Sequence, residues 1–249
     1  MMREIQSLAR GLKILAILAD APETASVSSI ALNLGIDKSS VSLLMQTLAN
    51  YGFAEQEPSN RQYRLGPAVV QLSRSLLTKM PLREAAKPFL LNLVQETGEC
   101  AHLGIHSQGK VFYIDQVESP QALRVNTEVG FTAPLHCTAL GKVLLAWDVA
   151  TLPGELESYT PRTQVDPKLL QLELDKTRSL GYATDDEEFT IGVRCVSAPV
   201  IDYRGKVIGA LGISGPASRI TIDKLPDMAE KVTAVASALS DRMSFISAD

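Results

Sequence analysis

Hydrophobic residues in the first fifty positions recur with the period of a helix and stop at turn-forming residues. This pattern predicts helices over residues 7–19, 27–34 and 38–51. Gly35 ends the second helix at a position that favours a left-handed residue, and Asp37 can cap the third helix. A short helix, a glycine turn and a further helix form the layout of a helix-turn-helix.

Two short segments with strand-like composition follow, at residues 53–56 and 62–65, with a polar turn between them. They predict a hairpin, and three helices followed by such a hairpin make a winged helix. Pro67 then stands where prolines start helices. We therefore expect a winged helix-turn-helix over residues 1–66 and a linker helix over residues 67–80.

Beyond residue 80 the chain alternates between helical and strand patterns. The expected helices are 82–97, 139–147, 169–180 and 224–243, and the expected strands are 102–107, 111–117, 193–201 and 207–214. Hairpins mixed with helices favour an α+β arrangement, within the broad α/β class, whose sheet is covered mainly on one side. The second domain is expected over residues 81–249.

Charge and cysteine content narrow the function only slightly. The net charge is −4, and residues 1–80 carry eight basic and six acidic side chains, so electrostatics alone would not indicate DNA binding. The aromatic share of 5% disfavours a stacking surface for single-stranded nucleic acid. The cysteines lack the spacing of a zinc site or a disulfide framework, so we expect no metal and no disulfides. We also expect no cofactor.

The start of the chain, Met1 to Glu4, is charged and leads into a helical pattern rather than a signal peptide. No apolar run is long enough to span a bilayer. We therefore expect the protein to be cytoplasmic.

The third predicted helix has a polar face of the kind that reads DNA. Val41, Leu44, Met45 and Leu48 fall in one arc, which we expect to face the core. The opposite face carries Ser39, Ser42, Leu43, Gln46, Thr47 and Asn50. Small hydroxyls and amides suit base edges and phosphates in a major groove. Ser39 and Ser40 also lie at the helix start, which favours phosphate oxygens.

Three further residues of this domain differ in how they could contact DNA. Leu43 points to the middle of the polar face, where it can touch a thymine methyl group or pack on a neighbouring segment. Arg61 lies at the tip of the hairpin, where an arginine fits a phosphate or the minor groove. Arg64, on the second strand, is interpreted as a solvated side chain.

Four motifs follow one another in the second half of the chain. They are Pro134-Leu135-His136-Cys137-Thr138-Ala139-Leu140-Gly141-Lys142, Gly181-Tyr182-Ala183-Thr184-Asp185-Asp186-Glu187-Glu188, Gly192-Val193-Arg194-Cys195-Val196-Ser197-Ala198-Pro199 and Ile213-Ser214-Gly215-Pro216-Ala217-Ser218-Arg219. Weaker marks nearer the N-terminus are Ser7-Leu8-Ala9-Arg10-Gly11-Leu12, Lys38-Ser39-Ser40-Val41 and Tyr63-Arg64-Leu65-Gly66. Taken together, over nearly the whole chain, these motifs resemble the isocitrate-lyase-regulator (IclR) family of bacterial transcription regulators.

The resemblance implies a GAF-like effector-binding domain, a homodimer formed through the N-terminal domains and often a dimer of dimers. It implies a repressor or activator of catabolic genes that binds double-stranded DNA, at a palindromic operator, and responds to a small molecule such as a carboxylate or an aromatic metabolite. The family often has Arg where this chain has Leu43, so a family rule for base readout does not transfer to that position.

The resemblance also implies an effector pocket. The corresponding positions here are Ala133, Ala139, Leu140, Asp185, Cys195 and Ser214. Thr138 can cap a helix that starts at Ala139, whose free N–H groups form an anion site. Asp185 can accept from a ligand hydroxyl, and Ser214 can donate or accept. Each also has a plain structural interpretation: Asp185 in a solvated acidic run, Cys195 in strand core and Ser214 as a strand-end cap.

Two other functional classes are compatible with parts of the sequence. An enzyme could use His136 and Cys137 as base and nucleophile, but adjacent residues on an extended segment point to opposite faces. His102 and His106 share a face of a predicted strand and could begin a metal site, although the sequence shows no third ligand. A sensor that acts only through protein partners would not need the outward polar residues of the third helix and hairpin. We expect a ligand-responsive DNA-binding regulator without catalytic residues.

Overall fold

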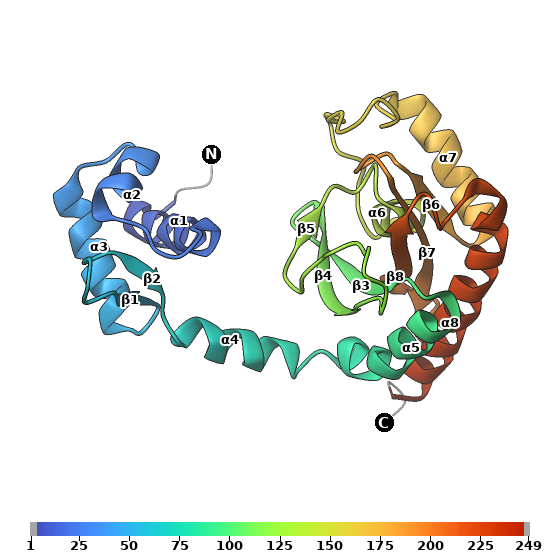
Figure 1. The fold of residues 1–249 in the computed structure, drawn as a ribbon, viewed down its shortest axis with the longest axis horizontal. Coiled ribbons are helices and arrows are strands. Elements are labelled where there is room, and N and C mark those ends of the chain that lie inside the picture. The colour runs from blue at the N-terminus through green and yellow to red at the C-terminus, as the bar shows by residue number, and fades with distance from the viewer. Residues whose placement is uncertain (1–3, 247–249) are drawn as a thin grey trace. The chain divides into compact units, whose positions relative to one another are not determined.

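The computed structural model describes residues 4–246, so residues 1–3 of the charged start lie outside the described residues. The chain forms two compact units, residues 1–79 and 80–249 (Figure 1). Within the described range, no helix combines the length and hydrophobicity needed to cross a membrane.

The N-terminal unit is a three-helix winged helix, as predicted. Its helices are α1 (Gln6–Asp20), α2 (Val27–Leu34) and α3 (Lys38–Asn50), and the antiparallel strands β1 (Ala54–Gln56) and β2 (Tyr63–Leu65) form the hairpin. Ile14, Ile30, Val41 and Met45 are fully buried and hold the three helices together. The hydrophobic period of the third helix therefore placed Val41 and Met45 correctly in the core of this unit.

Helix boundaries in this unit follow from local chemistry. Gly35 has φ 64° and closes α2 in the left-handed region, which costs glycine little. Asp37 caps α3, where its carboxylate accepts from the backbone N–H of Ser40 at 2.8 Å. In α1 the buried residues are Ile14 and Leu18, whereas Leu8 and Leu12 are more than half exposed. The stripe that contains Leu8 and Leu12 is thus an uncovered face of this unit.

Pro67 immediately precedes the linker helix α4 (Ala68–Leu77), as its position predicted. Val70, Leu72 and Leu76 on α4 are all more than half exposed. No residue of α4 is buried by the described part of the chain. Like α1, this helix presents uncovered apolar side chains.

The second unit is built on a six-stranded antiparallel sheet in the order β5-β4-β3-β8-β7-β6. The strands are β3 (Cys100–Ser107), β4 (Lys110–Val117), β5 (Thr132–Ala133), β6 (Ala183–Asp186), β7 (Val193–Ile201) and β8 (Val207–Pro216). The helices are α5 (Pro81–Thr97), α6 (Ala139–Ala146), α7 (Pro167–Leu180) and α8 (Leu225–Ile246), with a short 3-10 turn η1 (Ile222–Lys224) before the last. The α+β class is confirmed.

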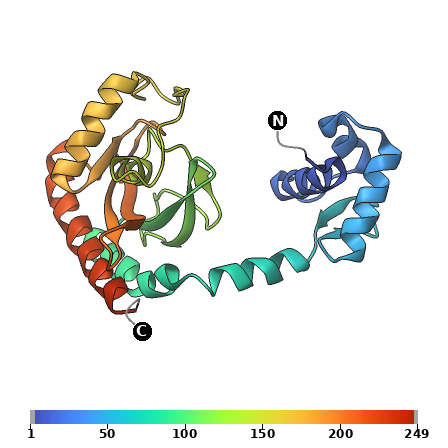
Figure 2. The ribbon, with the colours of Figure 1, turned by 180° about the vertical axis from the view of Figure 1, so that it is seen from behind.

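Helices cover both faces of this sheet (Figure 1 and Figure 2). The helices α5 and α8 pack on one face, with Leu90 and Val232 in a core shared with β3, β7 and β8. The helix α6 packs on the other face, beside α7 and β6, with Leu144 and Leu170 in a second core. The expected one-sided coverage was therefore wrong, because the short α6 fills the other side of the curled sheet.

The helix α6 approaches the backbone of the preceding segment very closely. A Cβ atom added at Gly141 would lie 2.2 Å from the carbonyl oxygen of Leu135 and 2.5 Å from its Cα. Backbone atoms cannot yield as a flexible side chain can, so only glycine allows this approach. The glycine in the first turn of α6 thus fixes the start of this helix against the segment that leads into it.

Candidate DNA-reading face and ligand cavity

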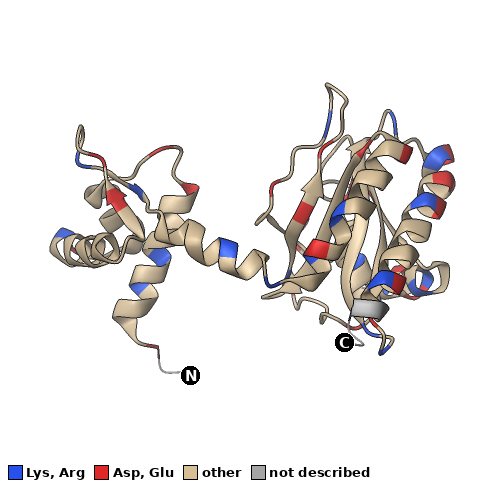
Figure 3. Cartoon of the chain, turned by 90° about the horizontal axis from the view of Figure 1, so that it is seen from below, with Lys and Arg blue, Asp and Glu red and all other residues tan. Residues whose placement is uncertain are grey.

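The recognition helix α3 turns its apolar arc inward and its polar arc outward, as predicted. Val41 and Met45 are buried, and Leu44 and Leu48 are half-buried against the core. The opposite arc is exposed or half-exposed and consists of Ser39, Ser42, Leu43, Gln46, Thr47 and Asn50. Lys38 is the only charged residue of this helix. Figure 3 shows most of the ribbon of the N-terminal unit in the tan of uncharged residues. Readout by this face would rest on hydroxyl, amide and methyl groups.

Two observations refine the expected contacts at the start of this helix. Leu43 is 67% exposed, so it packs on no neighbouring segment of its own unit. The hydroxyls of Ser39 and Ser40 both donate to the carboxylate of Asp37. These hydrogen bonds hold the pKa of Asp37 well below its usual range. A phosphate at this helix start would have to compete with Asp37 for the serine donors.

The two arginines of the wing have different surroundings. Arg61 is exposed in the turn of the hairpin and has a positive φ of 58°. Arg64 instead pairs with Glu55 at 3.0 Å and with Glu57 at 3.5 Å. The charge of Arg64 is therefore partly neutralised within the hairpin, whereas Arg61 lies exposed at its tip.

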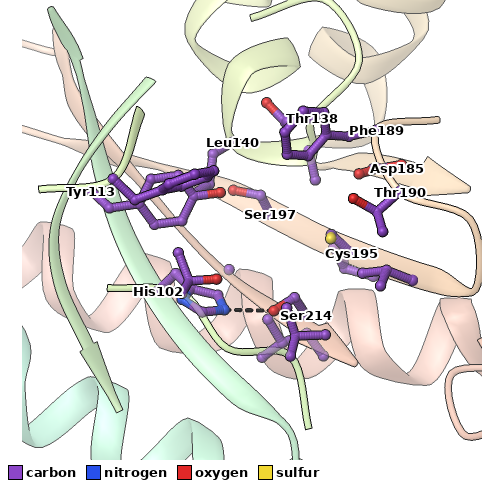
Figure 4. Close-up of a pocket in the computed structure, with 18 of the residues that line it drawn as sticks. His102, Tyr113, Thr138, Leu140, Asp185, Phe189, Thr190, Cys195, Ser197 and Ser214 are labelled. Atoms are coloured by element: carbon purple, nitrogen blue, oxygen red, sulfur yellow. Dashed lines mark hydrogen bonds between the residues drawn. The ribbon is translucent and has the colours of Figure 1, made fainter. Parts of the chain in front are cut away.

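The second unit encloses a cavity of about 230 Å³ between the sheet and the start of α6 (Figure 4). Of the six positions named for the effector pocket, five line this cavity: Ala139, Leu140, Asp185, Cys195 and Ser214. Ala133 is not among the lining residues and is buried in the core around Val111 and Leu135. Small-molecule sites commonly exceed about 300 Å³, so the cavity suits a small ligand.

Three of these residues stand side by side because of the register of the sheet. Asp185 on β6 lies opposite Cys195 on β7, and Cys195 lies opposite Ser214 on β8. Residues opposite one another on paired strands point to the same face. The row therefore faces α6, where Thr138 caps the helix by accepting from the N–H of Gly141 at 3.2 Å. The first N–H groups of α6 lack intrahelical partners and are suited to an anion.

Asp185 is not part of a solvated acidic run, because it is only 2% exposed. Its carboxylate accepts from the N–H of Glu188 at 2.8 Å. Burial, with a contribution from the Glu188 carboxylate, raises the pKa of Asp185 to about 7. The same burial keeps the thiol of Cys195 protonated by raising its pKa. The pocket therefore holds a carboxyl group that changes charge near neutral pH.

A fully buried lysine, Lys142, contacts residues on either side of Asp185 in the chain. The sequence analysis did not assign it a role. Lys142 on α6 contacts the carboxylates of Glu173 and Glu188 at 2.5 Å each and the carbonyl oxygen of Thr184 at 3.0 Å. The two carboxylates raise the pKa of Lys142 against the effect of burial. The ion pairs link α6, α7 and the turn after β6, and so hold the frame in which Asp185 sits.

His102 lines the pocket, and the sequence did not reveal its role there. It was considered only as a metal ligand with His106, yet it lines the cavity, whereas His106 accepts from the N–H of Gly109 near the end of β3. Within residues 4–246, no cluster of three or more His, Cys, Asp or Glu could hold a metal ion. The Nε2 atom of His102 lies 2.5 Å from the hydroxyl of Ser214.

The Cys–His pair considered as a nucleophile is not activated. Burial, with Asp185 and Glu188 nearby, raises the pKa of Cys137 to about 12. Its neighbour His136 places Nε2 2.9 Å from the backbone carbonyl oxygen of Glu157. A neutral, buried thiol is a poor nucleophile, so the geometry gives no support to covalent chemistry at this pair.

A winged helix joined to a second domain with an enclosed cavity is the architecture of a ligand-responsive transcription regulator. Residues 7–58 match the model of the IclR helix-turn-helix domain, and residues 74–241 match that of the bacterial transcriptional regulator IclR C-terminal domain. The chain therefore belongs to the IclR family, whose members bind DNA and small-molecule effectors.

Characterised relatives and solved structures resemble the chain along nearly its full length. The transcriptional regulator XynR of Escherichia coli K12 is 35% identical over 97% of this chain and 98% of its own. The glycerol operon regulatory protein of Streptomyces griseus is 38% identical over 94% of each chain. The crystal structure of Thermotoga maritima IclR superposes with a TM-score of 0.77 at 29% identity, covering 96% of this chain and 99% of that one.

An IclR homologue from Microbacterium hydrocarbonoxydans, crystallised with 4-hydroxybenzoate, has a TM-score of 0.80. It is 20% identical and covers 95% of this chain and 98% of its own, so it demonstrates the shared fold. These relatives are transcription regulators, which agrees with the expectation of a DNA-binding regulator rather than an enzyme.

Proposed function

We propose that this regulator binds a palindromic operator as a dimer and that a small monocarboxylate in the cavity controls this binding. The observation that carries the ligand assignment is the row of Asp185, Cys195 and Ser214 facing the start of α6. A helix start attracts one anionic group, whereas Asp185 disfavours a second carboxylate beside it. A hydroxy, keto or sugar acid with one anionic end satisfies both conditions.

The size and lining of the cavity support the same class of ligand. The volume is about 230 Å³, and the walls combine apolar groups such as Leu140 and Phe189 with a few polar groups. Relatives indicate useful probes without fixing the ligand: one homologue was crystallised with 4-hydroxybenzoate, and another is a glycerol operon regulator. Pyruvate, lactate, gluconate and 4-hydroxybenzoate form a test set of monocarboxylates, with succinate and glycerol as dicarboxylate and neutral controls.

On the DNA side, we propose that Ser42, Leu43, Gln46 and Asn50 face base edges while Arg61 contacts a phosphate or the minor groove. The exposure of Leu43, Gln46, Asn50 and Arg61, with Ser42 half-exposed beside them, supports this assignment. Ser39 and Ser40 are proposed as phosphate contacts that must share their donors with Asp37. The uncovered apolar residues of α1 and α4, including Leu8, Leu12 and Leu72, support dimerisation through the N-terminal unit.

One experiment tests both halves of this proposal. The full chain is first screened by thermal shift, because a ligand at 100 times its dissociation constant adds about 2.7 kcal/mol of stability. Binding to DNA from the regulator's own upstream region is then titrated with and without each acid that gives a shift. We expect a monocarboxylate, but neither succinate nor glycerol, to stabilise the protein and change its affinity for DNA. Stabilisation by glycerol alone would contradict the assigned ligand class.

A further inference from the structure

His102 and Ser214 form a polar pair at the end of the cavity away from Asp185 (Figure 4). They come from neighbouring strands, with 112 residues between them along the chain, and both are buried. Figure 4 marks a single hydrogen bond among the side chains drawn, and it joins Nε2 of His102 to the hydroxyl oxygen of Ser214. The second ring nitrogen, Nδ1, is buried and has no hydrogen-bond partner within the described residues.

The partnerless Nδ1 atom distinguishes the two neutral forms of this histidine. If Nδ1 carried the proton, a buried N–H donor would have no acceptor, and orphaned buried N–H groups are rare. If Nε2 carries the proton, Nδ1 keeps only an unused lone pair, and Nε2–H donates to Ser214. The ring is neutral in either case near pH 7, since burial lowers the pKa of His102 to about 4.

We infer that His102 is a positioning residue that fixes Ser214 as a hydrogen-bond donor toward the ligand. A serine oxygen that accepts from Nε2–H keeps its own O–H hydrogen available, and Ser214 lines the cavity. The ligand therefore presents an acceptor oxygen, such as a keto or carboxylate oxygen, at this end. This inference rests on the proposed ligand site. It adds that the ligand group next to Ser214 is a hydrogen-bond acceptor.

The ring of Tyr113 packs against the ring of His102. The two rings meet edge to face, with centroids 5.6 Å apart and an interplanar angle of 77°. Tyr113 and Ser214 both line the cavity with His102, so the imidazole contacts an aromatic ring and a hydroxyl within the same wall. The arrangement holds the donor nitrogen on Ser214 and leaves the serine hydroxyl as the group that meets the ligand.

A spectroscopic test does not depend on any ligand. The chain has three histidines, so nitrogen-15 NMR of the full protein labelled at histidine gives three imidazole patterns, and the pattern lost in His102→Gln identifies His102. We expect a neutral ring with hydrogen on Nε2 and none on Nδ1 at pH 7. A ring with hydrogen on Nδ1, or one charged at that pH, would overturn the inference.

A binding test uses 4-hydroxybenzoate and pyruvate as probes in calorimetry. Ser214→Ala should raise the dissociation constant roughly three- to tenfold, the usual effect of one hydrogen bond. His102→Leu should have a similar effect, whereas His102→Gln, which keeps an N–H donor in nearly the same place, should bind almost as the wild type does. In the Ser214→Ala background, His102→Leu should cause no further loss, because its effect passes through the serine.

The outcomes separate this inference from the proposed function. Additive losses in the double variant, or equal binding by wild type and His102→Leu, would show that His102 does not act through Ser214. If neither acid binds the wild type, the monocarboxylate assignment fails while the NMR result still decides the role of His102. Thermal denaturation of each variant identifies any that fails to fold, and His102→Gln then remains the informative one.

Discussion

The recognition surface and the ligand cavity are built in opposite ways. The recognition surface comes from one helix of 13 residues and the turn of the next hairpin, and its polar groups are exposed. The cavity gathers residues from five strands, the start of α6 and the connecting loops, between positions 102 and 214. Most of its polar groups, including His102, Asp185 and Ser214, are buried. Exposed polar residues are stable in water without partners, whereas buried ones need compensation from distant segments. Substitutions should therefore disturb the two surfaces in different ways.

The largest loss of stability is expected on replacing Lys142, because two carboxylates would lose the cation that pairs with them. Lys142→Met keeps most of the side-chain volume but leaves the buried Glu188 without its cation. Removing one partner of a buried ion pair costs about 3–5 kcal/mol, and we expect the lower end because Glu173 is one-third exposed. Urea denaturation followed by fluorescence measures this loss, since the only tryptophan, Trp147, caps the end of α6.

Lys176→Met provides the matched control for that measurement. Lys176 lies on α7 and is exposed, so the same chemical change there should alter the unfolding free energy of the second unit by less than about 0.5 kcal/mol. Equal effects of the two substitutions would mean that the pairs around Lys142 contribute nothing specific to the frame of the cavity.

The next largest effect concerns occupancy of the cavity. Ala139 lines the cavity and is 2% exposed, so Ala139→Trp should fill the space at the start of α6. We expect acid affinity to fall by at least about 100-fold, with DNA binding retained but no longer sensitive to the acid. Leu172→Trp, on the exposed surface of α7, adds the same ring outside the cavity and should leave both properties unchanged. Identical calorimetric titrations of wild type and Ala139→Trp would exclude this site.

The contrast between the two surfaces also explains which features could be predicted from sequence. Helical period and capping residues located α2 and α3 closely, and with them the outward positions Gln46 and Asn50. The strand β6 was not predicted, because four residues with two adjacent acids carry too little pattern. Asp185 itself was reached only through the family resemblance.

The roles of Lys142 and His102 depend on pairings that local patterns do not encode. Lys142 meets carboxylates 31 and 46 residues away, and His102 meets Ser214 across 112 residues. From sequence alone, a lysine in a helix is expected to be exposed to solvent, and a lone histidine on a strand is compatible with many roles. Only the register of β3 with β8 and the packing of α6 against α7 reveal these partners.

Alanine substitutions of Gln46 and Arg61 should affect DNA binding in different ways. Gln46→Ala should cost roughly 1–3 kcal/mol at one base pair and alter sequence preference. Arg61→Ala should weaken binding to all sequences and reduce the salt slope by about 0.9. Titrations on operator and scrambled DNA at several salt concentrations measure both effects. Equal loss by Gln46→Ala on the two DNAs, or an unchanged salt slope for Arg61→Ala, would remove that residue from its assigned contact.

The smallest effect, a dependence on pH, follows from the buried carboxyl of Asp185. Its pKa is about 7 in the folded chain against 3.8 ordinarily, so the folded state holds the proton more tightly and the contribution of Asp185 to stability falls as pH rises from about 4 to 7. The charged groups around it are Glu188 and Lys142, with Glu173 behind them and the neutral thiols of Cys137 and Cys195 alongside.

An acid bound at the start of α6 should favour the protonated form of Asp185, because a second negative charge in the small cavity is repelled. If only that form binds, the affinity follows its population and falls roughly tenfold between pH 6 and pH 8. Calorimetry with 4-hydroxybenzoate in buffers of different ionisation enthalpy measures this fall and the proton taken up. Asp185→Asn should remove both the fall in affinity and the proton uptake, because an amide cannot take up the proton. An affinity that rises with pH would show that the ionised carboxylate, acting as an acceptor for the ligand hydroxyl, is the form that binds.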